Sequence, residues 1–156
     1  MATMQALNWR DIIVRGLIAG IIGGILIDAF LYVATLVPQG QPITVIWQSV
    51  ASTALGKGAF ADPNSAWVGL CMHLATSIAW GVAFSYVAHT RPYVPQHPYV
   101  SGIVYGIIVM IIMQIVLMVS KSWTAPTVSS FLIDVVAHTV FFGLPVSLYV
   151  SRALRA

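Results

Sequence analysis

Residues 66–88 read AWVGLCMHLATSIAWGVAFSYVA, an apolar run of the length that an α-helix needs to cross a bilayer. One side chain within this run, His73, titrates near neutral pH. An imidazole inside a bilayer needs a polar partner, because an unpaired polar group costs several kcal/mol there. The partner of His73 must come from other apolar segments, so this stretch predicts a bundle of membrane helices around a polar site.

The composition of the whole chain agrees with this expectation. The 156 residues are 59% hydrophobic and 7% charged, with a mean hydropathy of +0.91. These values are typical of one membrane domain and not of a soluble protein. The net charge of +3 comes from Lys and Arg residues scattered between the apolar runs, which argues against a nucleic-acid partner. A single cysteine, Cys71, excludes an intrachain disulfide.

Four apolar runs predict four membrane-spanning helices, at residues 16–37, 66–88, 99–119 and 131–150. In the first loop, residues 43–55 carry apolar side chains at helical spacing, which predicts a short amphipathic helix. This helix either covers the mouth of the bundle or lies against lipid headgroups. Pro145 should interrupt the last span, because it frees the carbonyl of Phe141. The predicted fold is an all-α polytopic membrane four-helix bundle.

The distribution of positive charge predicts the orientation. Five arginines lie on one side of the spans, whereas the other side carries two lysines, Lys57 and Lys121. Short loops rich in Lys and Arg stay in the cytoplasm, so both termini should be cytoplasmic. Four tryptophans are expected to anchor the helix ends at the membrane interface: Trp9, Trp47, Trp67 and Trp123.

The two halves of the chain resemble each other. Glycines at four-residue spacing form small-residue strips in the first and third spans, where another helix can approach closely: Gly16, Gly20 and Gly24, then Gly102 and Gly106. Aligning the first span on the third also pairs Asp28 with Gln114, and the second and fourth spans then pair His73 with His138. This pattern predicts a tandem two-helix repeat with an axis along the membrane normal.

The polar residues of the spans share one depth. With a helical rise of about 1.5 Å per residue, four of them lie roughly 8 to 13 Å from the outer ends of their spans and Asp134 roughly 5 Å. We therefore expect one outward-facing pocket in the outer leaflet, lined by Asp28, His73, Gln114, Asp134 and His138.

Several functions fit such a pocket. A closed hydrogen-bond network, in which Asp28 and Asp134 hold His73 and His138 while Gln114 bridges, would serve packing alone. His73 and His138 could instead ligate one b-type haem, or the carboxylates and imidazoles could bind a proton or metal cation for translocation. Acid–base chemistry on a lipid-soluble substrate is the weakest option, because the chain has no nucleophile motif, phosphate loop or HExxH.

We expect a binding or accessory protein more than an enzyme, acting in the bilayer as a homo-oligomer or as a subunit of a larger membrane complex. Four spans are few for a transporter that acts alone. A haem electron carrier is the alternative function, and a proton or cation pathway is the third.

The chain also resembles the YagU-like family of small bacterial inner-membrane proteins from Gly16 to its end. The matching residues are Gln48, Ala51, Ser52, Leu55, Gly56, Ala59, Phe60, His73, Ala83, Tyr86, Gly102, Gly106, His138 and Gly143-Leu144-Pro145. The resemblance implies a bacterial inner-membrane protein and brings no established cofactor or catalytic residue. The role of Asp28 rests on the depth argument alone.

Overall fold

The computed structural model describes residues 8–120 and 124–155, and within these ranges the chain forms helices and no strand. Four long helical segments are apolar enough to cross a membrane, spanning Trp9–Gln39, Ser65–Thr90, Pro98–Val119 and Val128–Arg155. Each encloses one of the ranges expected from the sequence. The predicted all-α bundle with four apolar helices is confirmed. Lys121 and Trp123, used above for orientation and anchoring, lie outside the described residues.

The first and last of these segments are not regular throughout. The first is α1 (Trp9–Leu31), followed by a π-helical turn (Tyr32–Leu36) and a 3-10 turn (Val37–Gln39). The last begins with α6 (Val128–Val136), continues through a π-helical stretch (Ala137–Gly143) and ends with α7 (Leu144–Arg155). The second and third are the uninterrupted helices α3 (Ser65–Thr90) and α5 (Pro98–Val119).

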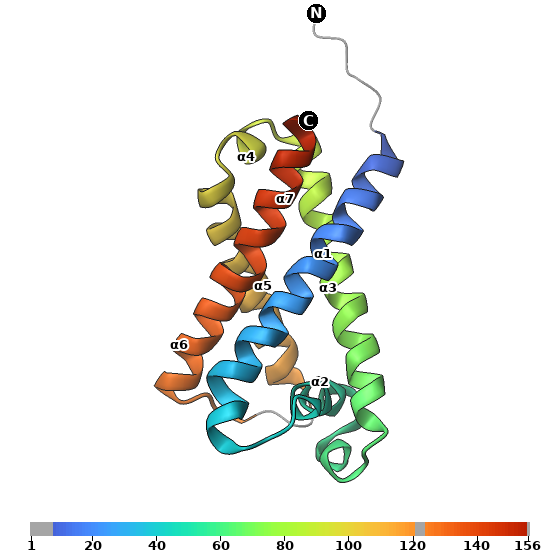
Figure 1. Cartoon of the computed structure of the whole chain (residues 1–156), viewed down its shortest axis with the longest axis vertical. Helices are drawn as coiled ribbons and strands as arrows, with labels where there is room; N and C mark the ends of the chain where they lie inside the picture. The colour runs from blue at the N-terminus through green and yellow to red at the C-terminus, as the bar shows by residue number, and fades with distance from the viewer. Residues whose placement is uncertain (1–7, 121–123, 156) are drawn as a thin grey trace, which may run out of the picture.

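Two short helices join the long ones. In the first loop, α2 (Thr44–Leu55) is followed by a 3-10 turn (Lys57–Ala61), and α4 (Tyr93–Gln96) occupies the connection between α3 and α5. The start of α1 and the end of α7 lie at one end of the bundle, and α2 lies at the other (Figure 1). The helix expected at residues 43–55 is therefore present, and it packs on α3.

The bundle consists of two tightly packed helix pairs. In the first pair α1 packs on α3, and in the second α5 packs on the π-helical stretch and α7. A Cβ atom on Gly81 would overlap the backbone of Gly16 and Gly20, and one on Gly143 would overlap Gly102 and Gly106. The pairs meet where α1 packs on α7, with the rings of Phe30 and Phe141 stacked 4.2 Å apart.

The outer surface of the bundle is apolar. Large hydrophobic side chains point outward from all four long helical segments, including Ile25 (58% exposed), Trp67 (68%), Ile111 (50%) and Leu132 (57%). In water such a surface would be unstable, whereas in a bilayer it faces acyl chains. The four apolar helices and this surface are compatible with a multi-pass membrane protein.

The interruption expected near Pro145 takes the form of the π-helical stretch. The N–H of Leu144 donates to the carbonyl of Thr139, five residues earlier, in place of the usual four. A π stretch of this kind inserts one extra residue into a helix. This extra residue shifts the polar side chains of α6 relative to those of α7, which matters for the site below.

Candidate functional site

The carboxylate of Asp28 receives donors from two other helices. Asp28 lies near the α2 end of α1, and its side chain is 11% exposed. Trp47 of α2 donates its indole N–H to Oδ2 over 2.9 Å, and Nε2 of His73 on α3 lies 3.2 Å from Oδ1. These three residues, which we call the Asp28 cluster, connect α1, α2 and α3 through one buried carboxylate.

His73 also contacts the backbone of α1. Its Nε2 atom lies 3.2 Å from the carbonyl oxygen of Gly24, so this one nitrogen faces two oxygen acceptors. With the carboxylate ionised, both oxygens only accept, and Nε2 must therefore carry a proton. Gly24, expected from the sequence as a packing residue, lies close to α3, since a Cβ there would come within 3.0 Å of the hydroxyl oxygen of Ser77.

The packing of α2 on α3 fixes the position of Trp47. Ala51 and Ser52 are buried, and Gly69 of α3 lies so close that a side chain there would overlap the carbonyl of Trp47. The sequence suggested an interfacial anchor at Trp47, and its role as a donor to Asp28 was missed. The sequence does contain one indication of this role, the position of Trp47 on the apolar face of the loop helix, because a buried indole N–H usually finds an acceptor.

A second carboxylate, Asp134 on α6, forms the Asp134 cluster. Its Oδ2 atom accepts from Nε2 of Gln114 on α5 over 2.5 Å, and its Oδ1 atom lies 3.1 Å from Nδ1 of His138. The same imidazole nitrogen lies 3.0 Å from the backbone oxygen of Asp134, one helical turn earlier. The side chain of Asp134 is 25% exposed, more than that of Asp28.

The packing of the glycines shows which residues of the two helix pairs are equivalent. Gly20 contacts the carbonyl of Ser77, and Gly106 contacts that of His138. Hence His138 corresponds to Ser77. Asp134 lies four residues before His138 and His73 lies four residues before Ser77, so Asp134 corresponds to His73.

The structural equivalence therefore differs from the pairing expected from the sequence, which matched His73 of the second span with His138 of the fourth. Asp28 and Gln114 do correspond, since each lies eight residues after its glycine, Gly20 or Gly106. The Asp28–His73 contact in one pair thus has its counterpart in the Gln114–Asp134 contact in the other. The extra residue of the π stretch lies between this contact and Gly143, which corresponds to Gly81.

A family model for the "Family of unknown function (DUF6789)" matches residues 10–154. The chain belongs to this family. No curated protein and no solved structure matches the chain. Because the function of the family is unknown, membership assigns no ligand to either cluster, and the geometry of the clusters must carry the functional argument.

The five residues expected to line one pocket thus fall into two clusters. Among the described residues, hydrogen bonds and ion pairs join the members of each cluster, and none of these bonds runs between the clusters. Gln114 contacts Asp134 and does not bridge to His73. In the described ranges, no group of three or more His, Cys, Asp or Glu side chains is placed to hold a metal ion. What both clusters share is a carboxylate in contact with an imidazole.

Proposed function

We propose that this protein is an integral membrane binding protein and that the species bound at the Asp28 cluster is the proton. The observation that supports this most is the contact between Asp28 and His73 at 3.2 Å in a largely buried position. A carboxylate and an imidazole in contact share their protons, and the charge of the pair changes by one when a proton is added. Within an apolar bundle that change alters every nearby hydrogen bond.

The crowded surroundings of the Asp28 oxygens favour a proton over a larger ligand. Oδ2 already accepts from Trp47, and Oδ1 is buried against His73 without a hydrogen bond among the described residues. An ammonium group or a metal ion would have to displace one of these side chains, whereas a proton adds to the pair without needing space. Protonated Asp28 would also lose the charge that strengthens its hydrogen bond with Trp47.

Release of Trp47 from Asp28 would couple proton binding to the position of α2. This helix packs on α3, and the Trp47–Asp28 hydrogen bond connects it to α1. Weakening that bond favours movement of α2 away from the bundle. In this proposal α2 acts as a lid, the first of the two roles expected for the amphipathic loop helix.

Infrared difference spectroscopy with pH steps tests the proposal on the purified protein in nanodiscs. The wild type should show carboxyl and imidazole bands that change together as the pH is stepped, and Asp28→Asn and His73→Gln should each remove the same part of them, while the Asp134 cluster contributes the rest. Asp62→Asn is the matched control, because Asp62 is an exposed carboxylate of a loop. Bands of unchanged intensity in Asp28→Asn and His73→Gln would refute proton binding at this pair.

A b-type haem between His73 and His138 is the second candidate, and one observation favours it. His73 uses Nε2 and His138 uses Nδ1 in the contacts described, and each imidazole has a second nitrogen. A ligating histidine is commonly oriented in this way, through a bond from its other nitrogen to a carboxylate or a carbonyl. An absorption spectrum decides: a Soret band lost in His73→Ala and His138→Ala supports haem, and a colourless folded protein excludes it.

The cellular setting is also part of the proposal. The resemblance to the YagU-like family and the excess of arginine at one end support a bacterial inner membrane with both termini in the cytoplasm. We further propose that the protein acts as a homo-oligomer or within a larger membrane complex. If the Asp28 cluster passes protons across the membrane, Asp28→Asn should remove proton flux in proteoliposomes.

A further inference from the structure

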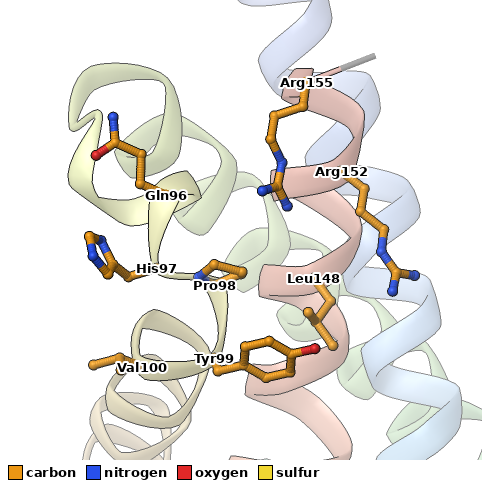
Figure 2. A pocket seen from close by; sticks show the side chains of 8 residues that line it. All are labelled: Gln96, His97, Pro98, Tyr99, Val100, Leu148, Arg152 and Arg155. Atoms are coloured by element: carbon orange, nitrogen blue, oxygen red, sulfur yellow. The ribbon is translucent and has the colours of Figure 1, made fainter.

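A hollow lies at the end of the bundle opposite α2. It has a volume of about 450 Å³ and lies between the turn that joins α4 to α5 and the last turns of α7 (Figure 2). Arg152 and Arg155 of α7 line it together with Tyr99 of α5, and among the described residues no carboxylate does. The lining thus supplies two cations and, among the described residues, no anion; the guanidinium of Arg155 points toward the turn before α5, whereas that of the exposed Arg152 extends to the other side of α7 (Figure 2).

A second hollow, of about 510 Å³, adjoins the first along α7. The two share Leu148 and Arg152, and the second is completed by apolar or aromatic side chains that include Pro145 and Tyr149. Pro145 lies two helical turns before Arg152, about 10 Å further towards the middle of the bundle. Together the hollows form a groove that is basic at its outer end and apolar further in.

The charges around the groove strengthen its preference for anions. Arg10, Arg15 and Arg91 belong to the same end of the bundle, where Asp11 is the one carboxylate of the described residues. Asp11 lies 3.9 Å from Arg15 and is thereby partly neutralised. Arg155 donates through Nε to the carbonyl of Ser151 over 3.1 Å, which fixes the side chain and leaves its two terminal nitrogens for a ligand. A guanidinium fork matches the geometry of a phosphate.

We propose that this groove binds an anionic phospholipid, with its phosphate at Arg155 and at Arg152 once the exposed Arg152 side chain turns into the groove, and with an acyl chain along Leu148 and Pro145. A free phosphate ion would use the arginines and leave the apolar hollow without a function. A phospholipid uses both parts, and their order along α7 matches that of headgroup and acyl chain in a bilayer. Basic pockets between membrane helices are common headgroup sites.

Lipid binding to the purified full-length chain in detergent tests the proposal. The ligands are phosphatidylglycerol and phosphatidylcholine with identical acyl chains, and inorganic phosphate is the competitor. The double variant Arg152→Gln/Arg155→Gln should bind phosphatidylglycerol about ten- to thirtyfold more weakly than the wild type. The matched control Arg10→Gln/Arg91→Gln removes the same charge at the same end of the bundle, outside the groove, and should change the affinity less than threefold.

A third variant separates a lipid from a free phosphate. Ala153→Trp fills the second hollow, because Ala153 lines that hollow and not the first, and it keeps both arginines. It should therefore weaken binding of phosphatidylglycerol and leave binding of inorganic phosphate unchanged. Three results would each overturn the proposal: equal losses in the two double variants, equal affinity for the two lipids, or lipid binding that is insensitive to Ala153→Trp. Thermal unfolding confirms that each variant is folded, which the exposure of all four arginines favours.

Discussion

Asp134 occupies in the second helix pair the place that His73 occupies in the first. Each lies four residues before a residue whose carbonyl faces a glycine of the neighbouring helix, which is Ser77 at Gly20 and His138 at Gly106. Each also contacts the polar residue eight positions after that glycine, Asp28 in the first pair and Gln114 in the second. The two pairs therefore carry the same contact between neighbouring helices with different chemistry. In the first pair the carboxylate is Asp28 of the first span, and in the second pair it is Asp134 of the fourth span.

This equivalence predicts that the second contact can be converted into the first. Gln114→Asp replaces the amide that donates to Asp134 with a second carboxylate near it, and Asp134→His removes the acceptor of Gln114, so each single variant should lose about 1–3 kcal/mol of stability. The double variant Gln114→Asp/Asp134→His recreates an Asp–His pair and should unfold within about 1 kcal/mol of the wild type. Thermal unfolding in detergent measures all three. Losses that add in the double variant would contradict the equivalence.

Trp47→Phe should loosen α2 and leave the rest of the bundle folded. The variant keeps an aromatic ring and removes the N–H that donates to Asp28, a bond to a charged group worth about 1.5–3 kcal/mol. Limited proteolysis and hydrogen exchange should both show faster opening at residues 44–55. Trp67→Phe is the control, because Trp67 is 68% exposed and no described hydrogen bond uses its indole. Equal protection of α2 in both variants would show that Trp47 does not hold it.

The glycines between paired helices should tolerate no side chain. Gly81→Ala and Gly143→Ala each place a methyl group against backbone atoms of the partner helix, which cannot move aside as a flexible side chain can. We expect a loss of about 1–3 kcal/mol or a failure to fold, measured as the yield of monodisperse protein and its melting temperature. Gly58→Ala, with open space around it, should behave as the wild type. Normal stability in Gly81→Ala would mean that α1 and α3 lie further apart.

The fold could be predicted from the sequence because its signals are local and strong. Apolar runs of membrane-spanning length give each long helix, and Gly16, Gly20, Gly102 and Gly106 lie in small-residue strips whose spacing is visible in the chain. The partner glycines Gly81 and Gly143 were not recognised as packing residues, because neither has a second glycine four residues away.

The arrangement of the polar residues could be predicted only in part. Their common depth follows from helical rise, but depth does not say which way a side chain points around the helix. The π stretch at Ala137–Gly143 adds one residue that the periodicity of the sequence does not reveal, and it accounts for one of the four residues that separate Asp134 from the expected counterpart, His138. Trp47 was missed for a different reason, since its contact with Asp28 depends on how the loop helix folds back over the bundle.

Two serines on α7 should respond in opposite ways to loss of their hydroxyl groups. Ser147 and Ser151 lie one turn apart, and both are 0% exposed. Ser147 donates to the carbonyl of Pro98 over 2.8 Å, whereas the hydroxyl of Ser151 has no hydrogen-bond partner among the described residues. An unpaired buried hydroxyl costs stability, and a paired one contributes about 1 kcal/mol.

Ser147→Ala should therefore destabilise the protein by about 1 kcal/mol, and Ser151→Ala should be neutral or stabilising by a similar amount. The two changes remove the same atoms at equal burial on the same helix, so each serves as the control for the other. Chemical denaturation in mixed micelles measures the difference between the variants, which should reach about 1–2 kcal/mol in favour of Ser151→Ala. Equal destabilisation by both changes would reveal a partner of Ser151, such as a buried water molecule held between α7 and its neighbours.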